Sequence, residues 1–185
     1  MLYFGKDSTL IPLMEIATSS SSSSSSFLKS EPHFINDVFI NFREEEISRK
    51  FIWHLNNVLL QAQVKTFVDE KNLQERMKLE EHMGAIACSK IAIIVFSKTY
   101  TESALCLREL EKIIECHETF GQIVMPVFYQ VNPFDVCTKC DFGKALEEAA
   151  EESYSEEQLK HVLSRWSHAL TKAAVITGWD VKDFR

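Results

Sequence analysis

The sequence predicts an α/β fold in which a parallel sheet is covered by helices. Strand-like runs alternate with amphipathic helical stripes along the chain, and short links join them. One of these runs, residues 91–96, is apolar at every position, which is typical of a strand covered on both faces. Parallel sheets of this kind bind ligands beyond the carboxyl ends of their strands. The segments that follow Phe42, Val68, Phe96 and Tyr129 are therefore where a binding site is expected.

The predicted strands are short runs rich in β-branched and aromatic residues, most of them followed by polar clusters. They are residues 37–42, 64–68, 91–96, 123–129 and a short last strand at residues 175–180. Pro126 removes one donor from the fourth ladder but leaves the apolar pattern intact.

Helices are predicted where apolar residues recur every three or four positions. These stripes lie in residues 51–62, 79–87, 107–114 and 159–170. A run of acidic residues between positions 147 and 157 indicates a solvated helix face and linker. Because strands and helices alternate, right-handed crossovers would place helices on both faces of the sheet.

Composition and charge exclude several classes of protein. The chain has 185 residues with 20 Lys and Arg against 27 Asp and Glu, a formal charge of −7, which argues against nucleic acid or an anionic membrane as the main partner. No apolar run approaches the ~20 residues of a membrane span. Five scattered cysteines suit a reducing compartment, so the cytoplasm is expected, with the nucleus also open.

An uninterrupted run of eight serines at positions 19–26 divides the chain. Such a tract buries nothing and cannot offset its ordering entropy. We therefore expect residues 1–33 to be a disordered leader and residues 34–182 to form one domain.

Several common motifs are missing from the sequence. The five glycines form neither a G-x-G-x-x-G nor a G-x-x-x-x-G-K pattern, which argues against a Rossmann dehydrogenase and a P-loop NTPase. Cys137 and Cys140 form a C-x-x-C pair, but a zinc site requires a second pair of ligands that no nearby spacing supplies. No metal site and no cofactor are predicted.

Two charged residues follow predicted strands and are candidates for a site. Arg43 could bind a phosphate or carboxylate, or could form a salt bridge with its acidic neighbours. Glu109 falls outside the Leu107, Leu110 and Ile114 stripe, in the first turns of a helix at the ligand edge. Its carboxylate could stabilise a developing cation or orient a sugar hydroxyl, or it could be an ordinary solvated helix residue.

Trp53 and His54 are candidates for an interface. Trp53 falls off the apolar stripe of its helix, so the helix would present it outward. An exposed tryptophan is a common interface residue, and the alternative is an aromatic covered by a neighbouring loop.

Taken together, four blocks of the sequence resemble plant TIR (Toll/interleukin-1 receptor/resistance-protein) domains. D-V-F-I-N-F-R at 37–43 resembles the D-V-F-L-S-F-R of that family, and T-F-V-D at 66–69 resembles its T-F-x-D. Residues 85–100 resemble A-I-x-x-S-x-I-x-I-x-V-F-S-x-x-Y. Residues 106–110 and 121–133 resemble C-L-x-E-L and G-x-x-V-x-P-V-F-Y-x-V-x-P.

This resemblance implies a flavodoxin-like three-layer α/β/α fold with a five-stranded parallel sheet. It implies plant immune signalling by self-association with other TIR domains, and an NAD+ glycohydrolase for which NAD+ is the substrate. Glu109, the Glu of C-L-x-E-L, would be catalytic, and Phe42, Arg43 and Ser103 would line the substrate site. Trp53-His54 stands where the family usually has a Ser-His pair in its pairing helix.

Some positions depart from the family pattern. Glu44 stands where the family has Gly, Leu105 stands where it has Trp, and the segment around Arg76 lacks the usual Gly. These changes fall on catalysis and assembly, so they favour an alternative function. That alternative is a catalytically weak or inactive interaction module, an adaptor or decoy that pairs with other TIR domains.

Overall fold

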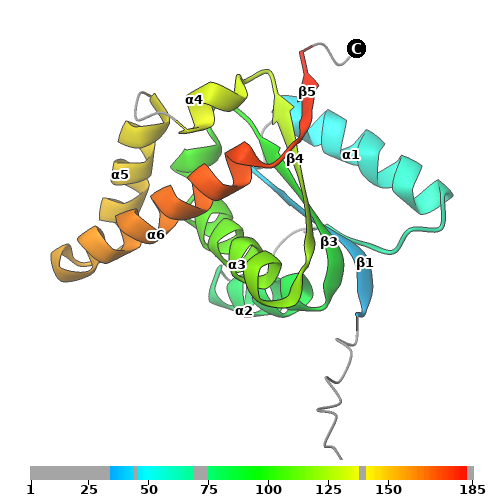
Figure 1. The fold of residues 1–185 in the computed structure, drawn as a ribbon, viewed down its shortest axis with the longest axis horizontal. Coiled ribbons are helices and arrows are strands. Elements are labelled where there is room, and N and C mark those ends of the chain that lie inside the picture. Colours follow the sequence, from blue (N-terminus) through cyan, green and yellow to red (C-terminus); the bar gives the residue numbers. More distant parts are fainter. Residues whose placement is uncertain (1–33, 44–45, 69–74, 138–140, 183–185) are drawn as a thin grey trace, which may run out of the picture. The chain divides into compact units, whose positions relative to one another are not determined.

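The computed structural model describes residues 34–43, 46–68, 75–137 and 141–182, and the expected leader lies outside them. Within these ranges the chain forms a five-stranded parallel sheet in the order β2-β1-β3-β4-β5 (Figure 1). The strands are β1 (Asn36–Phe42), β2 (Thr66–Phe67), β3 (Ser89–Phe96), β4 (Ile123–Tyr129) and β5 (Trp179–Val181). This strand order confirms the predicted flavodoxin-like architecture.

All four predicted helical stripes lie in helices, and the structure adds two short helices that the sequence does not predict, Tyr100–Glu102 and Pro133–Cys137. The helices are α1 (Glu46–Gln61), α2 (Glu75–Ala87), the short 3-10 helix η1 (Tyr100–Glu102), α3 (Ala104–Phe120), α4 (Pro133–Cys137), α5 (Asp141–Ser153) and α6 (Glu156–Val175). The prediction for the last strand begins too early, because α6 continues through Val175 and β5 begins only at Trp179. A capping box at Ser155 starts α6, and its buried face continues to Ala173.

Helices cover both faces of the sheet, but unevenly (Figure 1). On one face α1 packs on a small cluster that includes Val38, Ile40 and Val95. The other face carries the larger cluster, in which Phe39 and Ile94 of the sheet meet Leu110 of α3 and other residues of α2, α5 and α6. Most of the buried apolar surface, and with it most of the hydrophobic stabilisation, therefore lies on the α3 face.

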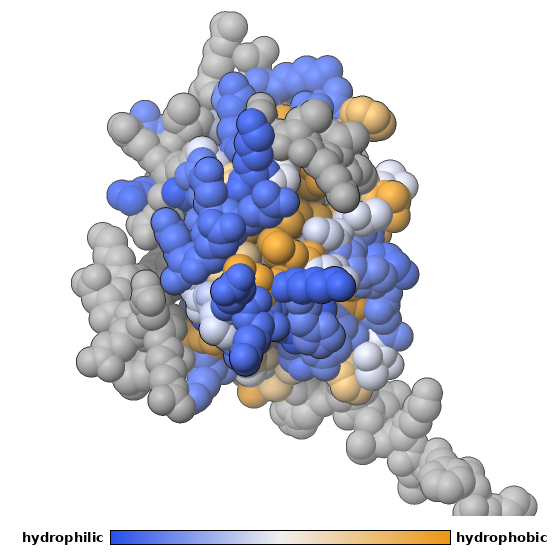
Figure 2. All heavy atoms as spheres, turned by 90° about the vertical axis from the view of Figure 1, so that its left-hand side faces the viewer, coloured by the Kyte–Doolittle hydropathy of each residue, from blue (hydrophilic) through white to orange (hydrophobic). Residues whose placement is uncertain are grey.

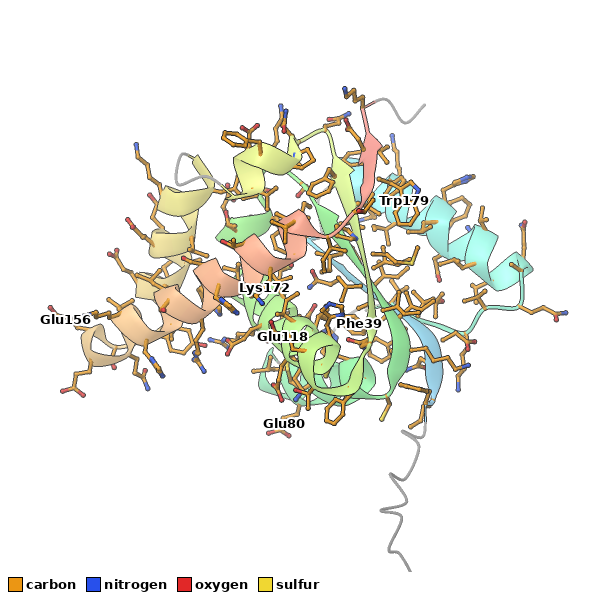
Figure 3. The ribbon with its side chains drawn as sticks, in the orientation of Figure 1. Phe39, Glu80, Glu118, Glu156, Lys172 and Trp179 are labelled. Carbon is orange, nitrogen blue, oxygen red and sulfur yellow. The ribbon has the colours of Figure 1, made fainter. Side chains whose placement is uncertain are left out.

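Ion pairs and solvated charges complete the outer layer. Lys172 of α6 pairs with Glu118 of α3 at 2.8 Å (Figure 3). The acidic side chains at positions 147–157 are exposed, as predicted for a solvated helix face. Figure 2 shows the side of the molecule that carries α5 and α6, which is mostly hydrophilic around a central apolar strip. None of the helices in the described ranges is both long enough and apolar enough to cross a membrane.

The topology brings distant segments together at the carboxyl ends of β1 and β3. These two strands lie side by side with Phe42 opposite Val95, so the chain leaves both at the same edge of the sheet. After β3 the chain turns through η1 and enters α3, which packs back across the end of β1. This edge is where the sequence predicts a site.

Candidate functional site

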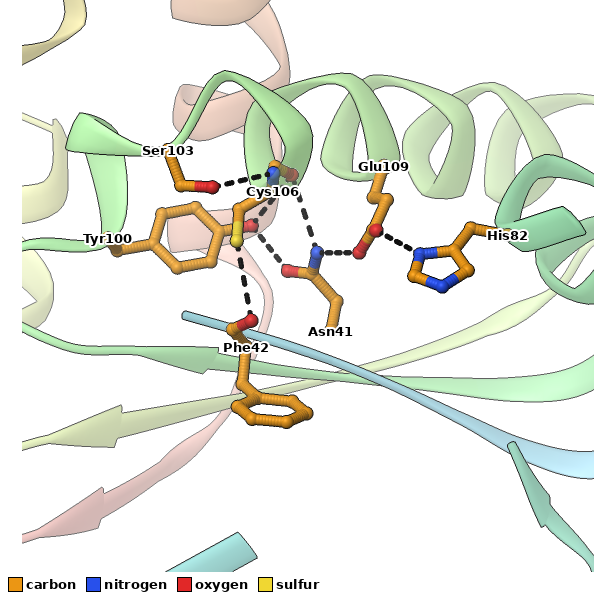
Figure 4. Close-up of polar contacts among 7 residues, drawn as sticks. All are labelled: Asn41, Phe42, His82, Tyr100, Ser103, Cys106 and Glu109. Carbon is orange, nitrogen blue, oxygen red and sulfur yellow. Dashed lines mark hydrogen bonds and ion pairs between the residues drawn. The ribbon is translucent and has the colours of Figure 1, made fainter. Parts of the chain in front are cut away.

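Glu109 lies in the second turn of α3, and its side chain points toward the sheet (Figure 4). Only 4% of the residue is exposed, so the expectation that it lies off the core stripe is wrong. Cys106, Ile113 and Cys116 are also buried, and they stand three, four and seven positions from Glu109. The buried face of α3 is therefore wider than the Leu107, Leu110 and Ile114 stripe and includes Glu109.

Both oxygens of the Glu109 carboxylate have a partner within the chain. The Nδ2 atom of Asn41 donates to Oε2 at 2.7 Å. The Nδ1 atom of His82 lies 2.5 Å from Oε1 (Figure 4). A buried carboxylate is costly unless it is hydrogen-bonded in this way, so the two contacts account for its stable position in the interior.

Strand β1 and helices α2 and α3 supply the side chains of this arrangement. Side chains alternate along β1, so Asn41 faces α3 together with Phe39, whereas Ile40 faces α1. The hydroxyl of Ser103 accepts a hydrogen bond from the Cys106 backbone N–H at 3.3 Å and caps the start of α3.

His82 reaches the carboxylate from α2. Its ring stands edge-on to the rings of Phe39 and Phe67, at centroid distances of 6.1 and 5.5 Å. This aromatic packing sets the orientation of the imidazole.

Asn41 links Glu109 to a wider buried network. Its Nδ2 also donates to the Cys106 carbonyl at 3.3 Å, and its Oδ1 accepts from the Tyr100 hydroxyl. Burial, with the nearby Cys106 and Glu109, raises the pKa of Tyr100 well above its ordinary value. Burial, with a contribution from Glu109, raises the pKa of Cys106 to about 12. Both groups therefore surround Glu109 as neutral side chains at physiological pH.

The predicted substrate-binding residues lie around this network in different ways. Arg43 donates to the Thr99 carbonyl at 2.6 Å and pairs with Glu102 of η1 at 2.6 Å. The Phe42 carbonyl accepts from the Cys106 thiol, but the Phe42 ring packs in the cluster on the α1 face (Figure 4). The structure thus brings Ser103 and the Phe42 backbone to the site, places the Phe42 ring on the other face, and ties Arg43 to η1.

The predicted interface residues lie on the outer side of α1. Trp53 is 70% exposed and His54 is also exposed. Trp53 is therefore not covered by a neighbouring loop of the described residues. The role of Trp53 and His54 in an interface stays a prediction.

The residues of the site that the sequence does not single out are Asn41, His82 and Tyr100. Each is polar and less than 5% exposed, and each contacts Glu109 or a partner of Glu109. Asn41 carries a usable signal, because an amide inside an otherwise apolar strand requires a hydrogen-bonding partner. The sequence gives little indication that His82 belongs to the site, because its partner Glu109 lies on a different helix.

Other features of the sequence remain outside the site. Among the described residues no cluster of three or more His, Cys, Asp and Glu side chains could hold a metal ion. Residues 138–140 and the Cys137 side chain, which make up the C-x-x-C pair, lie outside the described structure. Glu44 and the Arg76 side chain also lie outside it, while Leu105 is half-buried in the first turn of α3.

Comparisons with known proteins agree with this architecture. Residues 36–185 match the sequence family described as the TIR domain. TMV resistance protein N of Nicotiana glutinosa is 41% identical over 165 residues, 88% of this chain and 13% of that protein. Disease resistance protein RPV1 of Vitis rotundifolia is 37% identical over 168 residues, 90% of this chain and 11% of that protein. The chain thus spans a small part of the length of these relatives.

A solved structure is similar to the fold as a whole. It is described as the TIR domains of the activated Roq1 resistosome, which directly recognises the pathogen effector XopQ. The TM-score is 0.69 at 39% identity, and the match covers 80% of this chain and 89% of that one.

Proposed function

This chain belongs to the TIR domain family, and we propose that it is an immune-signalling NAD+ glycohydrolase activated by self-association. Residues 34–182 would form the signalling domain, behind a leader of residues 1–33. The scattered cysteines favour action in the cytoplasm. The family match and the relatedness to plant disease resistance proteins support the signalling role.

The observation that carries the proposal is the placement of Glu109. Its carboxylate lies beside the carboxyl end of β1, at the edge where open α/β sheets bind ligands. Asn41, which is completely buried in β1, holds Oε2, so the charge is held in a defined orientation. A preoriented carboxylate is suited to a reaction that develops positive charge on a sugar.

Cleavage of NAD+ is such a reaction. The bond between the ribose carbon and the nicotinamide nitrogen breaks, and its electron pair neutralises the pyridinium, so nicotinamide leaves as a neutral molecule. The ribose develops oxocarbenium character, which the Glu109 carboxylate would stabilise while it orients a ribose hydroxyl. Water then adds to the sugar carbon and releases a proton. Because the leaving group is already activated, a separate general acid is not required.

The need for self-association follows from the burial of Glu109. A residue that is 4% exposed cannot meet a nucleotide without a local rearrangement. Similarly, Arg43 is paired with Glu102 and would have to exchange that partner for a phosphate. Assembly with a second TIR domain would supply the free energy for this change. The similarity to TIR domains of a resistosome supports assembly as the trigger.

The same contacts favour a second candidate function, an adaptor or decoy that pairs with other TIR domains. Both Glu109 oxygens have a partner within the chain, and Arg43 is paired with Glu102, so neither side chain depends on a ligand for a partner. Leu105 offers no aromatic surface for stacking at the start of α3. This candidate predicts self-association without turnover of NAD+.

Incubation of concentrated purified protein with NAD+ distinguishes the two candidates. The enzyme hypothesis predicts nicotinamide release that rises more steeply than linearly with protein concentration and disappears in Glu109→Ala. Association measured by sedimentation, without Glu109-dependent release at any concentration, would establish the interaction module instead.

A further inference from the structure

The two contacts on Glu109 form a clamp whose arms come from different layers of the fold. Asn41 of β1 holds Oε2 and His82 of α2 holds Oε1 (Figure 4). We propose that Asn41 and His82 are positioning residues that keep the Glu109 carboxylate turned into the protein, and that Glu109 becomes accessible only when the His82 arm opens. The proposal rests on the proposed NAD+ cleavage for its kinetic consequence, but its structural part is testable without NAD+.

The Asn41 arm is the fixed one. Asn41 is completely buried in β1, which is paired with β2 on one side and β3 on the other. The amide is further held by the Cys106 carbonyl and the Tyr100 hydroxyl. Moving Asn41 would break this network and disturb the middle of the sheet, so this contact persists whenever the domain is folded.

The His82 arm can open at lower cost. His82 belongs to a helix outside the sheet, so a shift of α2 or a rotation of the His82 side chain separates the ring from Oε1 without breaking strand pairing. The rings of Phe39 and Phe67 stand edge-on to the imidazole and define the closed position. Opening frees one carboxylate oxygen while Asn41 still holds the other, which leaves Glu109 oriented and able to accept a ribose hydroxyl.

This clamp has a kinetic signature. A substrate that binds only the open form must overcome the cost of opening. Its apparent affinity therefore equals its affinity for the open form multiplied by the fraction of the protein that is open. Removing the His82 arm raises that fraction and lowers KM for NAD+. The chemistry on the open form is unchanged, so kcat at saturation stays similar. A hydrogen bond to a charged group is strong enough that KM should fall about tenfold or more.

Carbodiimide labelling of carboxylates, followed by peptide mass spectrometry, tests the clamp directly. In the wild-type protein Glu109 should be protected, whereas the exposed Glu115 is labelled and serves as the internal reference. His82→Leu should expose Glu109 to labelling at least several-fold, because the apolar side chain cannot hold Oε1. His82→Asn, which can still donate near the Nδ1 position, should restore most of the protection. His161→Leu, the same change at an exposed position of α6, is the matched control and should leave Glu109 protected.

Kinetics on an oligomerising scaffold add the second readout. His82→Leu should show the lower KM with kcat near that of wild type, and His82→Asn should move KM back toward the wild-type value. Equal protection of Glu109 in wild type and folded His82→Leu would overturn the clamp. A His82→Leu variant with lower kcat and unchanged KM would also overturn it, since His82 would then assist the reaction itself.

Two controls keep the outcomes separate. If no variant releases nicotinamide, the proposed enzymatic activity is refuted. The labelling result then tests the clamp by itself. If His82→Leu does not fold, imidazole NMR on the wild-type protein replaces it. The Nδ1 proton of His82 should appear far downfield because of the carboxylate, and it should move upfield in Glu109→Gln. An unaltered His82 signal in Glu109→Gln would contradict the contact.

Discussion

At the scale of single residues, the site is built around one buried carboxylate that the interior fully satisfies. Removing one partner of such a group leaves one buried oxygen atom without a hydrogen bond, which costs more than the loss of a surface contact. Tyr100 and Cys106 contribute as neutral neighbours, because burial raises the pKa of both groups. The network therefore combines a stability role with the orientation of Glu109.

The Cys106 thiol gives this network a measurable pH dependence. Its pKa is about 12 in the folded protein against a reference value of 9.0, so between these values the unfolded chain binds fewer protons than the folded one. Stability should therefore fall as pH rises from about 9 to 12. Urea midpoints across this range should show the decline, and Cys106→Ala should make it shallower but not abolish it, since Tyr100 adds to it. A slope that is identical in Cys106→Ala and in the control Cys88→Ala would contradict this.

The same residues show what the sequence can reveal about the site and what it cannot. The C-L-R-E-L block identifies Glu109, but periodicity based on three leucine and isoleucine positions places it outside the core. Counting Cys106 and Ile113 as apolar would widen the stripe to include it. The His82 contact depends on how α2 packs against α3, and no local pattern in the sequence encodes that packing.

At the scale of elements, the chain passes close to β4 just before β5 begins. Gly178 precedes β5, and a Cβ atom there would lie 2.4 Å from the Pro126 carbonyl oxygen and 2.9 Å from the Phe128 ring. Only glycine lets the chain pass this close to β4. The predicted strand at 175–180 begins too early, because Val175 and Ile176 have a high strand propensity but form the end of α6.

Gly178→Ala should therefore destabilise the protein by about 1–3 kcal/mol through overpacking against β4. Gly84→Ala is the matched control, because Gly84 lies inside α2 and its added methyl group would meet no atom within 4 Å other than its chain neighbours and the backbone of its own helix. Gly84→Ala should raise the free energy of unfolding by about 0.5–1 kcal/mol. Urea unfolding measures both, and equal free energies of unfolding for the two variants would refute the close-contact argument.

At the scale of the whole molecule, the uneven cover of the sheet suggests how domains associate. Of the described helices only α1 packs on its face of the sheet, and it also carries Trp53 on its outer side. Large exposed aromatics often contribute most of the affinity of an interface. The proposal of self-association through α1 therefore depends chiefly on Trp53, with His54 beside it.

Trp53→Ala should weaken self-association at least about tenfold without changing the fold. Phe134→Ala is a matched control, because Phe134 is an aromatic of the same 70% exposure located on α4. Sedimentation velocity over a concentration series measures the dissociation constants, and circular dichroism checks folding. An equal loss in both variants would indicate nonspecific apolar contact, and no loss in Trp53→Ala would exclude this residue from the interface.

The proposed activity itself is tested most directly by initial rates of nicotinamide release on an oligomerising scaffold, for wild type and Glu109→Gln. The glutamine keeps the size of the side chain but removes the negative charge, and its one amide oxygen can accept from only one of Asn41 and His82. We expect steady release by wild type and a loss of at least about a hundredfold in Glu109→Gln. No release from the scaffolded wild-type protein, or an equal rate in both proteins, would show that Glu109 does not carry out the proposed reaction.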